Sequence, residues 1–119
     1  MTNKILVAED EKPMAKALEL KLTSVGFEVE VAFDGEEAIK KIKDNKYDLI
    51  LLDLVMPKVD GFEVLKEIQK LKLATPVIVS SNLSQEEDRK KAKDLGAKDY
   101  FVKSDTTLNE LVEKVKQNL

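Results

Sequence analysis

The sequence predicts an α/β fold in which five strands form a doubly wound parallel sheet within a single domain. Apolar runs of strand length alternate with longer segments of helical period, five times in succession. This strict alternation favours parallel strands joined by right-handed crossovers, with helices on both faces of the sheet. No Pro-, Gly- or Ser-rich linker interrupts the chain, so we expect one domain over residues 1–119.

The five strands differ in their hydropathy pattern. Three runs, Ile5 to Ala8, Leu49 to Leu52 and Val77 to Val79, are continuously apolar, which is typical of central parallel strands. The segment Phe27 to Phe33 alternates between apolar and polar residues, and the run KDYFVK at 98–103 is mixed. These two patterns favour edge positions, so the second and fifth strands are expected at the two edges of the sheet.

Each predicted strand is followed by the start and stop signals of a helix. Pro13 suits the first turn of the first helix, and Gly26 ends it. The other four helices are predicted to begin at cap residues that have a glutamate three positions later, namely Asp34, Asp60, Ser84 and Thr107.

Composition excludes several classes of function. The chain is 43% hydrophobic and 36% charged with a net charge of -3, which argues against disorder and general nucleic-acid binding. It has no cysteine and no histidine, so disulfides, thiolate or imidazole zinc sites and Ser/His/Asp catalysis are excluded. The apolar runs are too short to cross a bilayer, and MTNKILVAEDE lacks the apolar stretch of a signal peptide. We expect a cytoplasmic protein without membrane contact.

Asp53 directly follows the apolar run Leu49 to Leu52. An ionised carboxylate is costly beside a buried strand unless the strand end is exposed or a cation lies near it. In doubly wound sheets, ligands bind beyond the carboxyl ends of the strands. The polar residues that follow each predicted strand are therefore the candidate site.

Three carboxylates of this set point to a metal. Glu9 and Asp10 follow the first strand, and they converge on Asp53 if the first and third strands are neighbours. Carboxylates that close repel one another unless a cation lies among them. Hard oxygen ligands suit Mg²⁺ better than a softer metal, so the sequence predicts a magnesium site.

A lysine and a hydroxyl face the same crevice from the other side. Ser81 follows the fourth predicted strand, and Lys103 follows the fifth. An ionised aspartate can act as a nucleophile, with a metal and a lysine neutralising charge as a phosphoryl group transfers. The set predicts an aspartyl phosphate on Asp53.

Four stretches carry a resemblance to a known family, namely ILVAEDE, DLILLDLVMPKVDGFEVL, TPVIVSSN and LGAKDYFVKS. In this order and spacing they resemble the receiver domain of two-component response regulators, of which the chemotaxis response regulator is the minimal form. The resemblance runs from about Lys4 to the C-terminus. It implies a flavodoxin-like (βα)5 sheet with strand order 2-1-3-4-5.

The resemblance also implies a role for each site residue. Asp53 matches the phosphate acceptor. Asp10 matches a direct ligand of Mg²⁺, and Glu9 matches a ligand acting through water. The backbone carbonyl of Val55 matches the third protein ligand of the metal.

The remaining matches concern the switch and its partners. Ser81 matches the hydroxyl that turns toward the phosphoryl group, Lys103 the invariant lysine, and Tyr100 the aromatic residue that swings inward. A histidine kinase or phosphotransfer protein would supply the phosphate. The output face would comprise the fourth helix, fifth strand and fifth helix, from about Ser84 to Leu119. Such a protein catalyses only its own phosphorylation and dephosphorylation and is not otherwise an enzyme.

The chain departs from the family pattern at several positions. Ser104 replaces a proline that normally follows the lysine in a cis peptide bond. A cis bond before a residue other than proline costs about 2.5 to 4 kcal/mol. The sequence therefore does not determine whether this bond is cis or trans, or how Lys103 is oriented. Asn82 replaces a small residue beside the phosphate. Val55 and Leu83 are apolar where the family tunes phosphate lifetime, so we expect attacking water to be poorly oriented.

Three other functions use a similar fold or site. An anionic cofactor such as a flavin is disfavoured because the loop EDEKPM presents carboxylates where phosphate needs backbone amides. A phosphatase with an aspartate nucleophile usually has a second aspartate two positions on, where this chain has Val55. The remaining alternative is a degenerate receiver that binds partners without phosphorylation; Ser104 and Asn82 favour it, whereas the intact acidic and lysine set argues against it. Because no helix-turn-helix follows Leu119 in this sequence, we expect no direct binding of nucleic acid.

Overall fold

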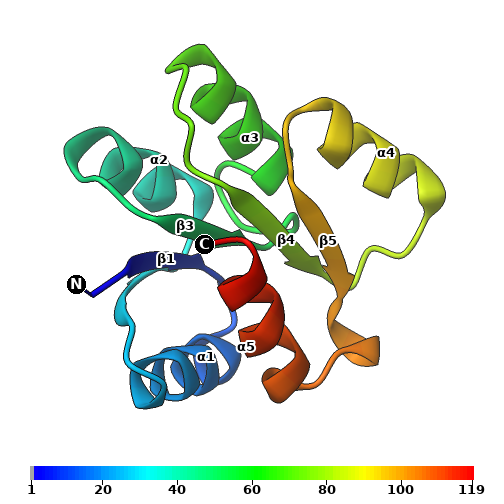
Figure 1. Cartoon of the computed structure of the whole chain (residues 1–119). Coiled ribbons are helices and arrows are strands. Elements are labelled where there is room, and N and C mark those ends of the chain that lie inside the picture. The colour runs from blue at the N-terminus through cyan, green and yellow to red at the C-terminus, as the bar shows by residue number, and fades with distance from the viewer. Residues whose placement is uncertain (1) are drawn as a thin grey trace.

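A computed structural model describes residues 2–119 and contains one five-stranded sheet (Figure 1). Every neighbouring pair of strands is parallel, and the strand order is β2-β1-β3-β4-β5, as predicted. The strands are β1 (Lys4–Ala8), β2 (Glu28–Ala32), β3 (Leu49–Leu52), β4 (Val77–Ser81) and β5 (Asp99–Val102). The predicted edge positions of the second and fifth strands are confirmed, because an alternating or mixed strand leaves part of its surface exposed.

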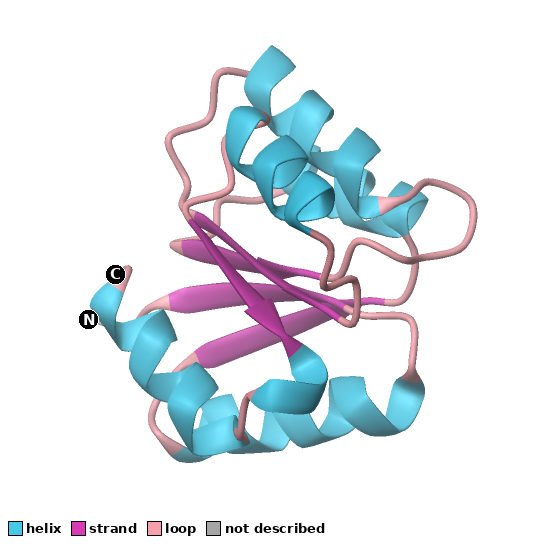
Figure 2. Cartoon of the chain, turned by 90° about the vertical axis from the view of Figure 1, so that its right-hand side faces the viewer, coloured by secondary structure: helices cyan, strands magenta, loops and turns pink. Residues whose placement is uncertain are grey.

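Helices cover both faces of the sheet (Figure 2). They are α1 (Lys12–Ser24), α2 (Gly35–Asp44), α3 (Gly61–Lys70), α4 (Glu86–Asp94) and α5 (Leu108–Gln117), and a 3-10 turn η1 (Lys103–Asp105) links β5 to α5. None of the helices in the described part of the chain is long and apolar enough to span a lipid bilayer.

The central strands divide their side chains between two cores. Along β1, Leu6 and Ala8 belong to the core beneath α2, α3 and α4, whereas Ile5 and Val7 belong to the core beneath α1 and α5. Successive side chains of a strand point to opposite faces, so a continuously apolar strand supplies both cores at once. The buried strands therefore form a rigid platform for the residues at their ends.

Three of the predicted caps are present. The Asp34 carboxylate accepts a hydrogen bond from the Glu37 amide at 2.7 Å, and the Asp60 carboxylate accepts one from the Glu63 amide at 3.0 Å. Thr107 and Glu110 form a reciprocal capping box at the start of α5. Pro13 lies in the first turn of α1, and Gly26 follows its end with a φ of 101°.

The prediction that Ser84 caps the fourth helix is wrong. Helix α4 begins at Glu86, and Gln85 is the residue before it, with no hydrogen bond from its side chain to the helix. Ser84 therefore lies one position too early for a cap. The three acidic residues of the first turn instead place negative charge near the positive end of the helix dipole.

The caps yield a paired stability prediction. We expect Thr107→Ala to lower the free energy of unfolding by about 1 kcal/mol, because it leaves an amide of the first turn of α5 without its acceptor. Ser84→Ala removes the same kind of hydroxyl next to α4 and should change the free energy by less than about 0.5 kcal/mol. Urea denaturation of both variants measures the difference, and equal losses would contradict this assignment of the caps.

Candidate functional site

The site lies at the carboxyl ends of the central strands, where the backbone of each strand fixes the residue that follows it. The Glu9 amide donates to the Ala32 carbonyl at 2.9 Å, and the Asp53 amide donates to the Ala8 carbonyl at 3.0 Å. Both residues therefore continue the hydrogen-bonding pattern of the sheet. Because β1 and β3 are neighbours, their side chains meet at the same edge.

The three carboxylates of the predicted metal site lie together. Glu9, Asp10 and Asp53 each offer an oxygen, and these oxygens are within 4.8 Å of one another. Glu9 is only 2% exposed and Asp53 only 5%, whereas Asp10 is half-buried. Clustered carboxylate oxygens with access to water fit a hard divalent cation such as Mg²⁺. The donor set thus meets the chemical requirement of the predicted metal.

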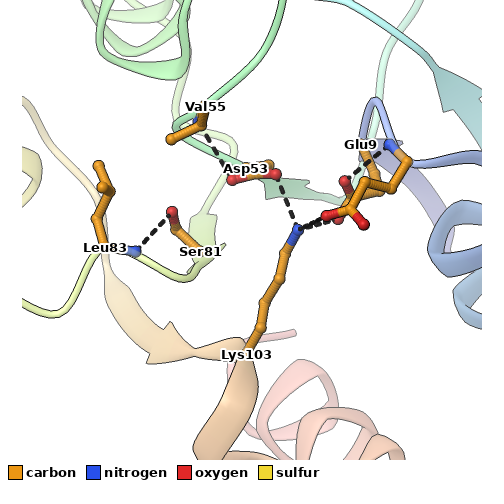
Figure 3. A network of polar contacts seen from close by, with 7 residues as sticks. Glu9, Asp53, Val55, Ser81, Leu83 and Lys103 are labelled. Atoms are coloured by element: carbon orange, nitrogen blue, oxygen red, sulfur yellow. Dashed lines mark hydrogen bonds and ion pairs between the residues drawn. The ribbon is translucent and has the colours of Figure 1, made fainter.

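Lys103, directly after β5, reaches this cluster (Figure 3). Its ammonium nitrogen lies 2.8 Å from Asp53 Oδ2 and forms an ion pair with Glu9 Oε1. The described residues contain no cis peptide bond, so the peptide between Lys103 and Ser104 is trans. Lys103 therefore contacts both carboxylates although Ser104 replaces the cis proline of the family that the sequence resembles.

Burial sets the proton affinity of these groups. Burial raises the pKa of Glu9 to about 7, and the nearby Asp53 charge adds to this, although hydrogen bonds from Lys103 and from the Glu11 amide oppose it. Burial alone would lower the pKa of Lys103, but its hydrogen bonds to Asp53 and Glu9 outweigh that effect and raise it. The lysine is thus held in its charged form.

A pocket of about 330 Å³ opens beside Asp53. One Asp53 oxygen, Oδ1, accepts a hydrogen bond from the Val55 amide at 3.2 Å, and the Ser81 hydroxyl oxygen accepts one from the Leu83 amide at 3.3 Å (Figure 3). The pocket is lined by Asp10, Glu11, Asp53, Val55, Ser81, Asn82, Leu83 and Lys103. Every predicted site residue except Glu9 and Tyr100 faces this space, and Glu9 is connected to it through Lys103.

Tyr100 does not line this pocket but contacts one residue that does, Leu83. Its hydroxyl donates to the Leu83 carbonyl at 2.7 Å, and the Arg89 guanidinium lies 5.0 Å from the centre of its ring. Burial raises the pKa of the Tyr100 hydroxyl. Sequence reasoning missed the contacts of Leu83 and Arg89, because one is made by a backbone carbonyl and the other depends on where α4 begins.

The family assignment rests on a match to residues 5–116. These residues match the family model described as the response regulator receiver domain. The chain belongs to this family. Receiver domains of this family are phosphorylation-based signalling switches of two-component systems.

Known proteins and structures agree with this assignment. The transcriptional regulatory protein DltR of Streptococcus agalactiae serotype III is 42% identical over 100 residues, which cover 84% of this chain and 45% of DltR. The chain thus spans less than half the length of this relative. The receiver domain of Francisella response regulator 1452 is 37% identical, with a TM-score of 0.93 and coverage of 98% of this chain and 96% of that one. The response regulator TrrA from Thermotoga maritima, in complex with Mg(2+)-BeF, is 37% identical, with a TM-score of 0.89 and coverage of 99% and 100%.

The raised pKa of Glu9 predicts a pH dependence in metal-free buffer. Glu9 holds its proton more tightly in the folded receiver domain, with a pKa of about 7, than at its ordinary value of 4.5. The stability from this group is therefore complete below about pH 4.5 and is lost as the pH rises through about 7. We expect Glu9→Gln to gain stability relative to the wild type as the pH rises across this range, measured by urea denaturation with EDTA.

A stability difference between Glu9→Gln and the wild type that stays constant over this pH range would contradict the assignment.

Proposed function

We propose that this receiver domain accepts a phosphoryl group onto Asp53 from a phosphohistidine of a histidine kinase or phosphotransfer protein. The proposal rests on the charged groups that surround the buried Asp53 carboxylate. Lys103 contacts one of its oxygens at 2.8 Å, and carboxylate oxygens of Glu9 and Asp10 lie within 4.8 Å. Charges of both signs thus surround an aspartate that borders an open pocket.

In the proposed transfer, a carboxylate oxygen of Asp53 attacks phosphorus. A new O–P bond forms, and the bond between phosphorus and the donor's imidazole nitrogen breaks, with its electron pair returning to the imidazole. Lys103 offsets the negative charge of the transferring group and holds the Asp53 carboxylate in place. The buried strand β3 limits the motion of the nucleophile, which favours a productive geometry.

We assign the magnesium site to Glu9, Asp10, Asp53 and the backbone carbonyl of Val55. When bound there, Mg²⁺ would supply positive charge to the phosphoryl oxygens. Two observations support the assignment, namely the clustered carboxylates and the Mg(2+)-BeF complex of the related TrrA.

We further propose that Ser81 and Tyr100 change conformation when Asp53 is phosphorylated. Both are hydrogen-bonded to Leu83, Ser81 through the Leu83 amide and Tyr100 through the Leu83 carbonyl. If Ser81 turns toward the phosphoryl group, its bond to the Leu83 amide is lost and the residue that holds Tyr100 becomes free to shift. Phosphorylation then favours one of two pre-existing states and changes protein binding at the face of α4, β5 and α5. We propose no contact of these residues with nucleic acid.

The first test is phosphorylation by a small donor. After incubation with acetyl phosphate and Mg²⁺, we expect intact mass spectrometry to show one added phosphoryl group on the wild type. The adduct should be absent with EDTA and in Asp53→Asn, because the nucleophile or the metal is then missing.

Asp44→Asn is the matched control, since it makes the same chemical change at an exposed position on α2. It should accept phosphate like the wild type. If the wild type forms no adduct, the degenerate receiver that binds its partner without phosphorylation becomes the better description.

The second test concerns the metal. Mg²⁺ at ten times its dissociation constant should stabilise the wild type by about 1.4 kcal/mol, because only the folded chain assembles the carboxylates. We expect this gain to shrink in Asp10→Asn and to persist in Asp44→Asn, as measured by thermal unfolding with and without Mg²⁺. A melting temperature of the wild type that does not respond to millimolar Mg²⁺ would contradict the metal site.

A further inference from the structure

The loop between β3 and α3 has an unusual turn at its tip. The Val59 amide donates to the Pro57 carbonyl at 2.8 Å, and Lys58 between them has a φ of 67°. This is a three-residue γ-turn with its central residue in the left-handed region, which non-glycine residues rarely adopt. Such a conformation persists only when surrounding contacts hold it.

The contacts that hold the tip come from the start of α2. The Gly35 amide approaches the Pro57 carbonyl at 3.5 Å, and the Lys58 ammonium lies 3.7 Å from the Asp34 carboxylate. A Cβ atom at Gly35 would lie 1.8 Å from the Val59 carbonyl oxygen and 2.6 Å from its carbonyl carbon. These are backbone atoms, so no side-chain rotation could relieve the clash. The loop can occupy its position only because residue 35 has no side chain.

Glycine is a poor helix former, and Asp34 already supplies the cap of α2. Helix formation therefore does not account for a glycine at the first position of this helix. The close approach of the loop does account for it.

The base of the same loop is held separately. The Gly61 amide donates to the Leu54 carbonyl at 2.9 Å, and a Cβ at Gly61 would lie 2.4 Å from the Asp53 carbonyl oxygen. Val55 lies between this base and the tip, one residue from Leu54 and two from Pro57. The Val55 amide donates a hydrogen bond to Asp53 Oδ1. A shift of the loop would therefore move both Val55 and the Asp53 carboxylate.

We infer that Gly35 is a positioning residue for the metal site, because it lets α2 hold the tip of the β3–α3 loop and thereby fixes the Val55 backbone beside Asp53. This inference rests on the proposed function, in which the Val55 carbonyl and the Asp53 carboxylate bind Mg²⁺. Gly35 itself contacts neither the metal nor the phosphoryl group.

The test compares two glycine substitutions by titration with Mg²⁺, followed through the NMR shifts of the Asp53 and Val55 amides. Gly35→Ala should raise the Mg²⁺ dissociation constant about tenfold or more, as is typical when a group that supports metal ligands is displaced. Gly26→Ala is the control, because its φ of 101° makes alanine strained there while nothing lies within 4 Å of the added Cβ. It should lower the melting temperature and leave the dissociation constant within about twofold of the wild type.

A second variant keeps the test decisive if Gly35→Ala does not fold. Val59→Gly removes the side chain that packs the tip against the core of α2 and α3, so the tip should loosen and Mg²⁺ should bind more weakly. The inference is overturned if Gly35→Ala and Val59→Gly both fold and bind Mg²⁺ as tightly as the wild type. If Gly35→Ala does not fold, the same result for Val59→Gly alone overturns it. If the wild type itself binds no Mg²⁺, the proposed metal site fails, and this inference fails with it.

Discussion

The site depends on one interaction, the contact of the Lys103 ammonium with the carboxylates of Glu9 and Asp53. Two carboxylates that are almost fully buried would repel each other and lose their hydration, and either effect alone would destabilise the fold. Lys103, the residue directly after β5, brings a positive charge to both. This one side chain thus connects the ends of β1, β3 and β5 at the edge where the chemistry is proposed.

The strand order makes this contact possible. Placing β3 next to β1 brings Asp53 beside Glu9. Because β4 lies between β3 and β5, the long side chain of Lys103 extends past the end of β4 to contact both carboxylates. The flexible arm of Lys103 also explains how a trans peptide before Ser104 is compatible with the contact.

The sequence predicts the elements whose signals lie within a few neighbouring residues. The continuously apolar runs at Leu49 to Leu52 and Val77 to Val79 fix the central strands, and the caps at Asp34 and Thr107 fix two helix starts, because these signals act over a few residues. Ser84 failed as a cap because α4 buries only Ala92, so no apolar periodicity sets its first turn. The close approach of Gly35 to Val59 involves backbone atoms 24 positions apart in sequence, for which a sequence pattern carries no signal.

Helix α4 buries little apolar surface, which is why its first residue was hard to predict and why the helix suits a switch. With one buried residue, α4 depends on the Lys91 ammonium 4.3 Å from the centre of the Phe62 ring and on the Arg89 contact with Tyr100. At an exposed position such as Lys91, a cation–π contact contributes only about 0.5 to 1 kcal/mol. In the proposed switch, a few new contacts at Ser81 would therefore shift the position of α4. The strands that precede Glu9 and Asp53 contribute side chains to both cores and would stay in place. A rigid site and a loosely held helix are what a domain needs if chemistry at one edge is to change binding at another.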